Sequence, residues 1–273
     1  MALNDLANEA RQQGFAIDDA TEYQLVDNVL ALVQDVNGEV KSVAVKTLAT
    51  LVPFVAPARI QTIIDRLVHF TASKDEGVRD IASLGLKMVV ANIAPDSPLA
   101  STCCTKLAPE VVKQLADPSS SAELVLDSLD LVSDVLSRFE STVRTLPALQ
   151  QSVLKAATPL LSHGRAAVRK RTVATLAVLV PSAHSPALLD SLLDSTVLPS
   201  LQAAAADDDD RLRTSISLVG ALARSAPAQV GPKAAALVPL VLRGADRADD
   251  EGKEGVLQCL EAFVLRCPHD AAP

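Results

Sequence analysis

Apolar residues recur at helical spacing along most of the chain. In one segment, Ile60, Ile63, Ile64, Leu67 and Val68 stand at positions i, i+3, i+4, i+7 and i+8. Residues at this spacing share one face of an α-helix, so the segment is predicted to form an amphipathic helix.

The same pattern predicts pairs of helices, a first and a second, joined by short polar turns. First helices are expected at 24–34, 58–72, 101–116, 146–162, 185–204 and 232–243. Second helices are expected at 38–54, 76–92, 121–139, 165–180, 210–225 and 251–267. With only 10 glycines, the chain is poorly suited to the many tight turns of an all-β fold, so the predicted class is all-α.

A basic residue near the start of the second helix marks an internal repeat. It occurs at Lys41, Arg79, Arg169, Arg213 and Lys253, while a degenerate copy carries Val125 in its place. Five steps separate Lys41 from Lys253, which gives a period of about 42 residues. The prolines Pro159, Pro199 and Pro239 recur at intervals of 40, and each is expected to kink its helix in the same way.

A helical hairpin of this length matches the HEAT and armadillo size class. Such hairpins cannot bury their apolar faces alone, so they are expected to stack as antiparallel pairs into a right-handed superhelical α-solenoid. We predict a single HEAT-repeat domain over 1–273, with a half repeat at 1–20 followed by repeats at 21–56, 57–97, 98–144, 145–184, 185–228 and 229–273.

The repeated basic residues are interpreted as a structural ladder. Lys41, Arg79, Arg169, Arg213 and Lys253 are each expected to pair with an acid or a carbonyl of the adjacent unit. Direct contact with a partner is the alternative role for the same five side chains.

Composition and charge narrow the functional classes. Apolar residues make up 49% of the chain, but aromatic residues only 2%, so Leu, Val, Ile and Ala must build the core. The formal charge of −8 argues against nucleic-acid binding, which needs clustered Lys and Arg. The N-terminus lacks the pattern of a signal peptide, and no apolar run is long enough to cross a membrane, so a soluble, intracellular protein is expected.

The sequence contains no grouping of residues typical of a catalytic or metal site. The cysteines Cys103, Cys104, Cys259 and Cys267 lack metal-ligand spacing and are expected to be reduced, buried thiols. The four histidines fall in different repeats, and no phosphate-binding or nucleophile motif occurs. We therefore predict no enzymatic activity, no cofactor and no metal. The acidic turns 207–210 and 246–251 are interpreted as solvated helix starts, with an edge that attracts a basic partner as the alternative.

Several stretches resemble one particular family. They are AVRKRT at 167–172, NGEV at 37–40 with AVK at 44–46, RDIASLGLK at 79–87, LDSLDLVSDVLSR at 126–138 and AFVLRCP at 262–268. In order and spacing these stretches are similar to the N-terminal HEAT repeats of the cullin-associated, neddylation-dissociated protein family.

The resemblance implies a function. Members of that family are longer HEAT superhelices that wrap around cullin–RING scaffolds lacking NEDD8 and exchange their substrate receptors. The N-terminal repeats engage the cullin C-terminal region and the RING subunit. This chain would supply that contact and pack against the remaining HEAT repeats, in cis or as a separate chain, in the cytoplasm and the nucleus. The resemblance also implies that the chain starts inside the first repeat, as a fragment, a short gene model or half of a split protein would.

Polar residues of the second helices that lie outside the core pattern are the candidates for partner contact. They are Glu39, Lys46, Asp80, Lys87, Asp127, Asp134, Lys170 and Arg171. A karyopherin-like or general HEAT adaptor, which would bind other cargo through the same concave face, is the alternative function.

Overall fold

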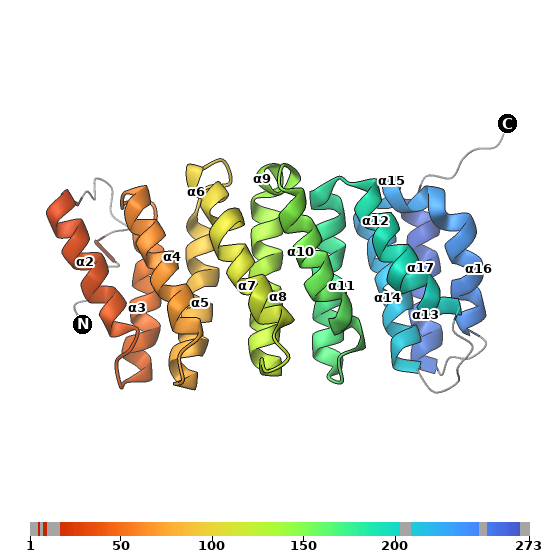
Figure 1. Ribbon diagram of the computed structural model, residues 1–273, viewed down its shortest axis with the longest axis horizontal. Coiled ribbons are helices and arrows are strands. Elements are labelled where there is room, and N and C mark those ends of the chain that lie inside the picture. The colour runs from red at the N-terminus through yellow and green to blue at the C-terminus, as the bar shows by residue number, and fades with distance from the viewer. Residues whose placement is uncertain (1–4, 6–7, 10–16, 203–208, 246–249, 268–273) are drawn as a thin grey trace. The chain divides into compact units, whose positions relative to one another are not determined.

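Helices form every regular element in the part of the chain that the computed structural model describes, namely residues 5, 8–9, 17–202, 209–245 and 250–267 (Figure 1). Most of the expected half repeat at 1–20 lies outside these residues, as do Asp207, Asp208 and the acidic residues of 246–249. The observed helices confirm the predicted all-α class.

The chain divides into two compact units. The first unit comprises residues 1–111 and 130–142, and the second comprises residues 112–129 and 143–273. Each unit is described by itself below. A single domain over the whole chain stays a prediction.

The first unit contains two layers of helices. One layer holds α2 (Asp19–Leu32), α4 (Pro57–Thr71), α6 (Pro98–Thr102), the π-helical turn η1 (Cys103–Leu107) and the start of α7 (Ala108–Ala116). The other layer holds α3 (Gly38–Leu51), α5 (Glu76–Asn92) and the C-terminal part of α8 (Ala122–Arg138). Helix α3 packs on both α2 and α5, and α4 packs on α5, so α2 and α4 are each paired with the second helix of the same repeat.

The second unit repeats this arrangement. Its first layer holds α10 (Pro147–Ala157), η2 (Thr158–Ser162), α12 (Pro186–Leu192), η3 (Leu193–Val197), α13 (Leu198–Gln202), α15 (Pro227–Val230), η4 (Gly231–Lys233) and α16 (Ala234–Ala245). Its second layer holds α11 (Ala166–Ala183), α14 (Asp209–Ser225) and α17 (Asp250–Arg266), with α14 packed against both neighbours. The short helix α9 (Glu140–Arg144), which follows α8, was not predicted.

Side-chain caps explain why two second helices begin after their polar turns. The side-chain oxygen of Asn37 accepts a hydrogen bond from the Glu39 amide at 2.8 Å, at the start of α3. The Asp75 carboxylate accepts one from the Val78 amide at 3.0 Å, at the start of α5. Each cap satisfies a backbone donor that has no partner inside the helix.

The repeated prolines do not share one local structure, so the expectation of identical kinks is wrong. Pro159 lies in the 3₁₀ turn η2, Pro199 lies in α13 directly after the π turn η3, and Pro239 lies inside α16. Pro109 also follows a π turn, η1, in which the Ala108 amide donates to the Cys103 carbonyl. A local π or 3₁₀ turn thus accompanies Pro109, Pro159 and Pro199, whereas Pro239 lies within a regular α-helix.

The cores consist mainly of Leu, Val, Ile and Ala, as the composition requires. All four cysteines are also buried, as predicted. Burial raises the pKa of the Cys103 thiol to about 12 and that of Cys259 to about 12. These thiols therefore remain protonated and pack as small apolar groups near neutral pH.

Candidate protein-binding site

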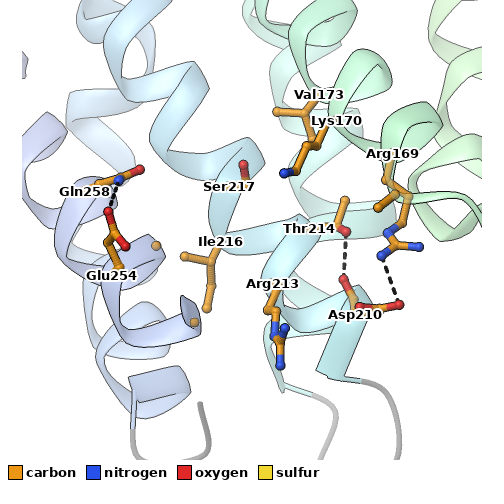
Figure 2. A pocket seen from close by; sticks show the side chains of 13 residues that line it. Arg169, Lys170, Val173, Asp210, Arg213, Thr214, Ile216, Ser217, Glu254 and Gln258 are labelled. Atoms are coloured by element: carbon orange, nitrogen blue, oxygen red, sulfur yellow. Dashed lines mark hydrogen bonds and ion pairs between the residues drawn. The ribbon is translucent and has the colours of Figure 1, made fainter. Parts of the chain in front are cut away.

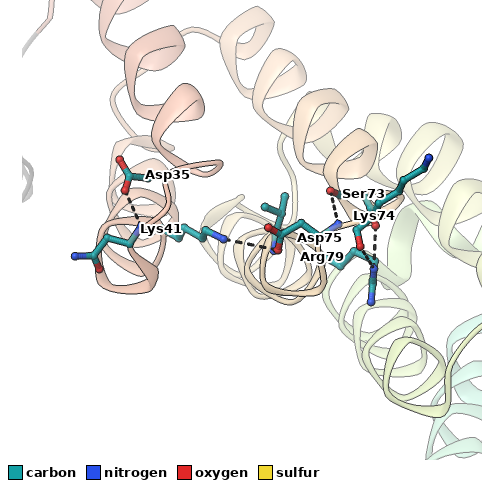
Figure 3. Close-up of polar contacts among 8 residues, drawn as sticks. Asp35, Lys41, Ser73, Lys74, Asp75 and Arg79 are labelled. Carbon is teal, nitrogen blue, oxygen red and sulfur yellow. Dashed lines mark hydrogen bonds and ion pairs between the residues drawn. The ribbon is translucent and has the colours of Figure 1, made fainter.

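In the first unit the ladder residues make two different kinds of contact (Figure 3). The Lys41 ammonium lies 3.8 Å from the Asp75 carboxylate, which belongs to the next repeat and caps α5. The Arg79 guanidinium instead donates to the carbonyls of Ser73 and Lys74, at 3.0 and 3.1 Å, in the turn before its own helix. Lys41 thus links two repeats, whereas the contacts of Arg79 fasten its own turn.

Arg169 of the second unit combines both kinds of contact. Its guanidinium donates to the carbonyls of His163 and Gly164, at 2.9 and 3.2 Å, in the turn before α11. It also lies 2.9 Å from the carboxylate of Asp210, in the first turn of α14. Of the remaining ladder residues, Arg213 is half-buried and Lys253 is exposed.

Replacing Arg169 with alanine is expected to lower the free energy of unfolding by about 2 kcal/mol, because two carbonyls lose a charged donor. The pair with Asp210 adds little, since that carboxylate is largely exposed. Urea denaturation followed by circular dichroism measures the loss. Arg171→Ala serves as the control, because Arg171 is exposed on the same helix. Equal losses in the two variants would contradict the assigned role of Arg169.

A cavity of about 470 Å³ lies in the second unit between α11, α14 and α17 (Figure 2). Val173 and Ile216, both buried, form the apolar part of its wall. Gly255 of α17 also lines the cavity, and a Cβ atom added there would meet nothing within 4 Å. The second-helix layer therefore contains an open space bounded by three successive repeats.

Polar side chains line the rest of the cavity. Lys170 extends from α11 toward the space, Ser217 belongs to α14, and Glu254 and Gln258 belong to α17. The Gln258 amide donates to the Glu254 carboxylate at 3.1 Å. Such a mixture of charged groups and hydrogen-bonding groups suits recognition of a polar segment of another protein.

The eight predicted contact residues are divided between the two units, five in the first and three in the second. Six of them are exposed, namely Glu39, Lys46, Asp80, Asp134, Lys170 and Arg171, while Lys87 and Asp127 are half-buried. Lys87 forms an ion pair with Asp130 at 3.1 Å, so it already has a partner inside the first unit. Lys170 lines the cavity, and the other seven do not.

Sequence reasoning missed Thr214 and Glu254, which also line the cavity. Each follows its ladder residue by one position, just as Lys170 follows Arg169. Lys170, Thr214 and Glu254 therefore occupy equivalent positions in three successive repeats, and the repeat period of the sequence could have identified them together.

Other kinds of site are not indicated in the described part of the chain. Its His, Cys, Asp and Glu side chains form no cluster of three or more that could hold a metal ion. None of its helices has the length and apolar character needed to cross a membrane.

The paired helices of each unit define a class of protein, the HEAT-repeat α-solenoids. A solved structure of Kap95p with RanGDP superposes on the chain with a TM-score of 0.69, covering 98% of this chain and 35% of that one. The two sequences are only 14% identical, so this likeness shows the fold alone.

Curated relatives narrow the class to a family. The whole chain is 36% identical to Cullin-associated NEDD8-dissociated protein 1 of Drosophila melanogaster and covers 21% of its length. It is 35% identical to Cullin-associated NEDD8-dissociated protein 2 of Mus musculus and covers 22% of that protein. The chain belongs to the cullin-associated NEDD8-dissociated protein family, which confirms the resemblance, and it spans about a fifth of the length of these relatives. It matches no protein-family model.

Proposed function

We propose that this chain is a non-catalytic scaffold that binds cullin–RING ubiquitin ligase cores lacking NEDD8. Its second-helix layer would contact the cullin C-terminal region and the RING subunit, and would contribute to ligase assembly and substrate-receptor exchange. Location in the cytoplasm and the nucleus belongs to the same proposal. The similarity of the whole chain to relatives named for cullin association carries it.

The described surface supports a protein-binding role. Exposed charged residues lie on α3, α5, α8 and α11 of the second-helix layers, and the cavity opens in that layer of the second unit. Contacts spread over several repeats would distribute the affinity over a large area, with a few anchor residues contributing most of it.

Contact with further HEAT repeats is part of the proposal. On α17 the side chains of Leu257, Val264 and Leu265 are 66%, 63% and 67% exposed. They are spaced at i, i+7 and i+8 and so share one face of the helix. An apolar face of this kind suits the packing of another helical hairpin, supplied in cis or by a separate chain.

A binding measurement with purified components tests the proposed function. The immobilised chain is exposed to a cullin–RING complex without NEDD8 and to the same complex after NEDD8 conjugation. We expect the unmodified complex to bind at least about tenfold more tightly, a difference of about 1.4 kcal/mol. Failure of the unmodified complex to bind, or equal affinity for both forms, would rule out the proposal.

A karyopherin-like adaptor would behave differently in the same assay. It would bind a Ran-type GTPase in preference to the cullin–RING complex. Including that GTPase as a separate analyte therefore distinguishes the two functions, which the shared fold cannot do.

A further inference from the structure

Basic residues outnumber acidic residues among the described residues that line the cavity between α11, α14 and α17. Of these described residues, Arg169, Lys170 and Arg213 are basic, and Asp210 and Glu254 are acidic, whereas the whole chain has a formal charge of −8. The ion pair between Arg169 and Asp210, at 2.9 Å, cancels one charge of each sign.

Lys170 differs from the other charged residues of the cavity. Its side chain is exposed and makes no hydrogen bond or ion pair with any residue that the structure describes. In Figure 2 its ammonium group points into the space beside Ser217, away from the Arg169–Asp210 pair. A cation placed in this way can accept a carboxylate from outside without first losing an internal partner.

We propose that the cavity is the docking site for an acidic segment of a protein partner, with an Asp or Glu carboxylate of that segment bound to the Lys170 ammonium. Ser217 and Gln258 supply hydrogen bonds to the polar groups beside that carboxylate. The buried side chains of Val173 and Ile216 give an apolar surface for its methylene groups. The assignment rests on the proposed protein-binding function of the second-helix layer and adds the chemistry of the bound segment.

Glu254 determines the orientation of the segment. Its carboxylate, held by the Gln258 amide at 3.1 Å, lies on the α17 side of the cavity, whereas Lys170 lies on the α11 side. A carboxylate that approached α17 would be repelled, so the acidic side chain is directed toward α11.

Two neighbouring residues provide a matched test. Lys170→Glu and Arg171→Glu make the same change of charge at adjacent exposed positions of α11, but only Lys170 lines the cavity. The first probe is a fluorescein-labelled peptide of alternating glutamate and serine, with a lysine–serine peptide of equal length for comparison. The second probe is the cullin–RING complex without NEDD8. Thermal unfolding of both variants verifies that they remain folded.

We expect Lys170→Glu to weaken binding of the glutamate–serine peptide by about fivefold or more. Arg171→Glu should change it by less than about twofold. Added salt should weaken the wild-type interaction, because an exposed charge pair is screened. The same ranking of variants is expected with the cullin–RING complex.

The docking site is overturned if the two variants bind alike, if the lysine–serine peptide binds as well as the glutamate–serine peptide, or if neither peptide binds. These failures are separable from failure of the proposed function. If the wild-type chain does not bind the cullin–RING complex but binds the acidic peptide through Lys170, the cullin partner is refuted and the docking site is supported. If the two variants bind the complex equally well, the proposed function is retained and the docking site is refuted.

Discussion

Replacing Phe139 with alanine should lower the free energy of unfolding of the first unit by about 4 kcal/mol. Phe139 follows α8, is 0% exposed and is the largest fully buried side chain of the described core. Its removal loses the transfer free energy of the ring and leaves a void that close-packed neighbours can fill only in part. Urea denaturation monitored by circular dichroism gives the shift in midpoint.

Phe54→Ala is the matched control, because Phe54 is 37% exposed in the same unit. The same substitution there should cost less than about 1.5 kcal/mol, since part of the ring already contacts water. If Phe139→Ala were no more destabilising than Phe54→Ala, the assigned position of Phe139 in the core would be wrong.

Gly220→Val should cost about 3 kcal/mol in the second unit. Helices α14 and α17 approach closely at this glycine, where an added Cβ would lie 3.1 Å from the Cα of Cys259 and 3.3 Å from its Cβ. The first of these atoms belongs to the backbone, so a rotamer change cannot relieve the contact. The two helices must therefore separate, and both lose packing along their interface. Thermal unfolding and urea denaturation measure the effect.

Gly255→Val is the comparison, because Gly255 is also helical and a Cβ added there meets nothing within 4 Å. We expect a change within about 0.5 kcal/mol, since valine and glycine differ little in helix propensity when nothing is displaced. If the two substitutions lowered the free energy of unfolding equally, helix propensity or β-branching would explain the effect of Gly220→Val. The close approach of α14 to α17 would then not be its cause.

The helices could be read from the sequence because their signals are local. The predicted segment 76–92 coincides with α5, and 165–180 lies within three residues of α11 at its far end. Apolar periodicity and capping residues such as Asp75 specify such elements without knowledge of their neighbours. The proline conformations were less predictable. Pro109 and Pro199 are accommodated by π turns, whose extra residue per turn leaves no simple mark in apolar spacing.

The candidate site depended on contacts between repeats, which the sequence specifies only indirectly. The predicted ladder gave Arg79 and Arg169 the same role, yet the described contacts of Arg79 stay within its own turn. Arg169, in contrast, also contacts Asp210 in the first turn of α14. Likewise, Lys87 and Lys170 look alike as exposed-face lysines in the sequence. Only the fold shows that Asp130 already binds Lys87.

The buried cysteines make local opening of each unit chemically observable. Cys103 and Cys104 lie in the first unit, and Cys259 and Cys267 lie in the second. A protected, protonated thiol reacts with an alkylating reagent only when its surroundings open, so the labelling rate at each site follows the opening of that unit. Mass spectrometry of the alkylated regions can therefore follow how each unit opens when a partner binds or a substitution is introduced, without an engineered labelling site.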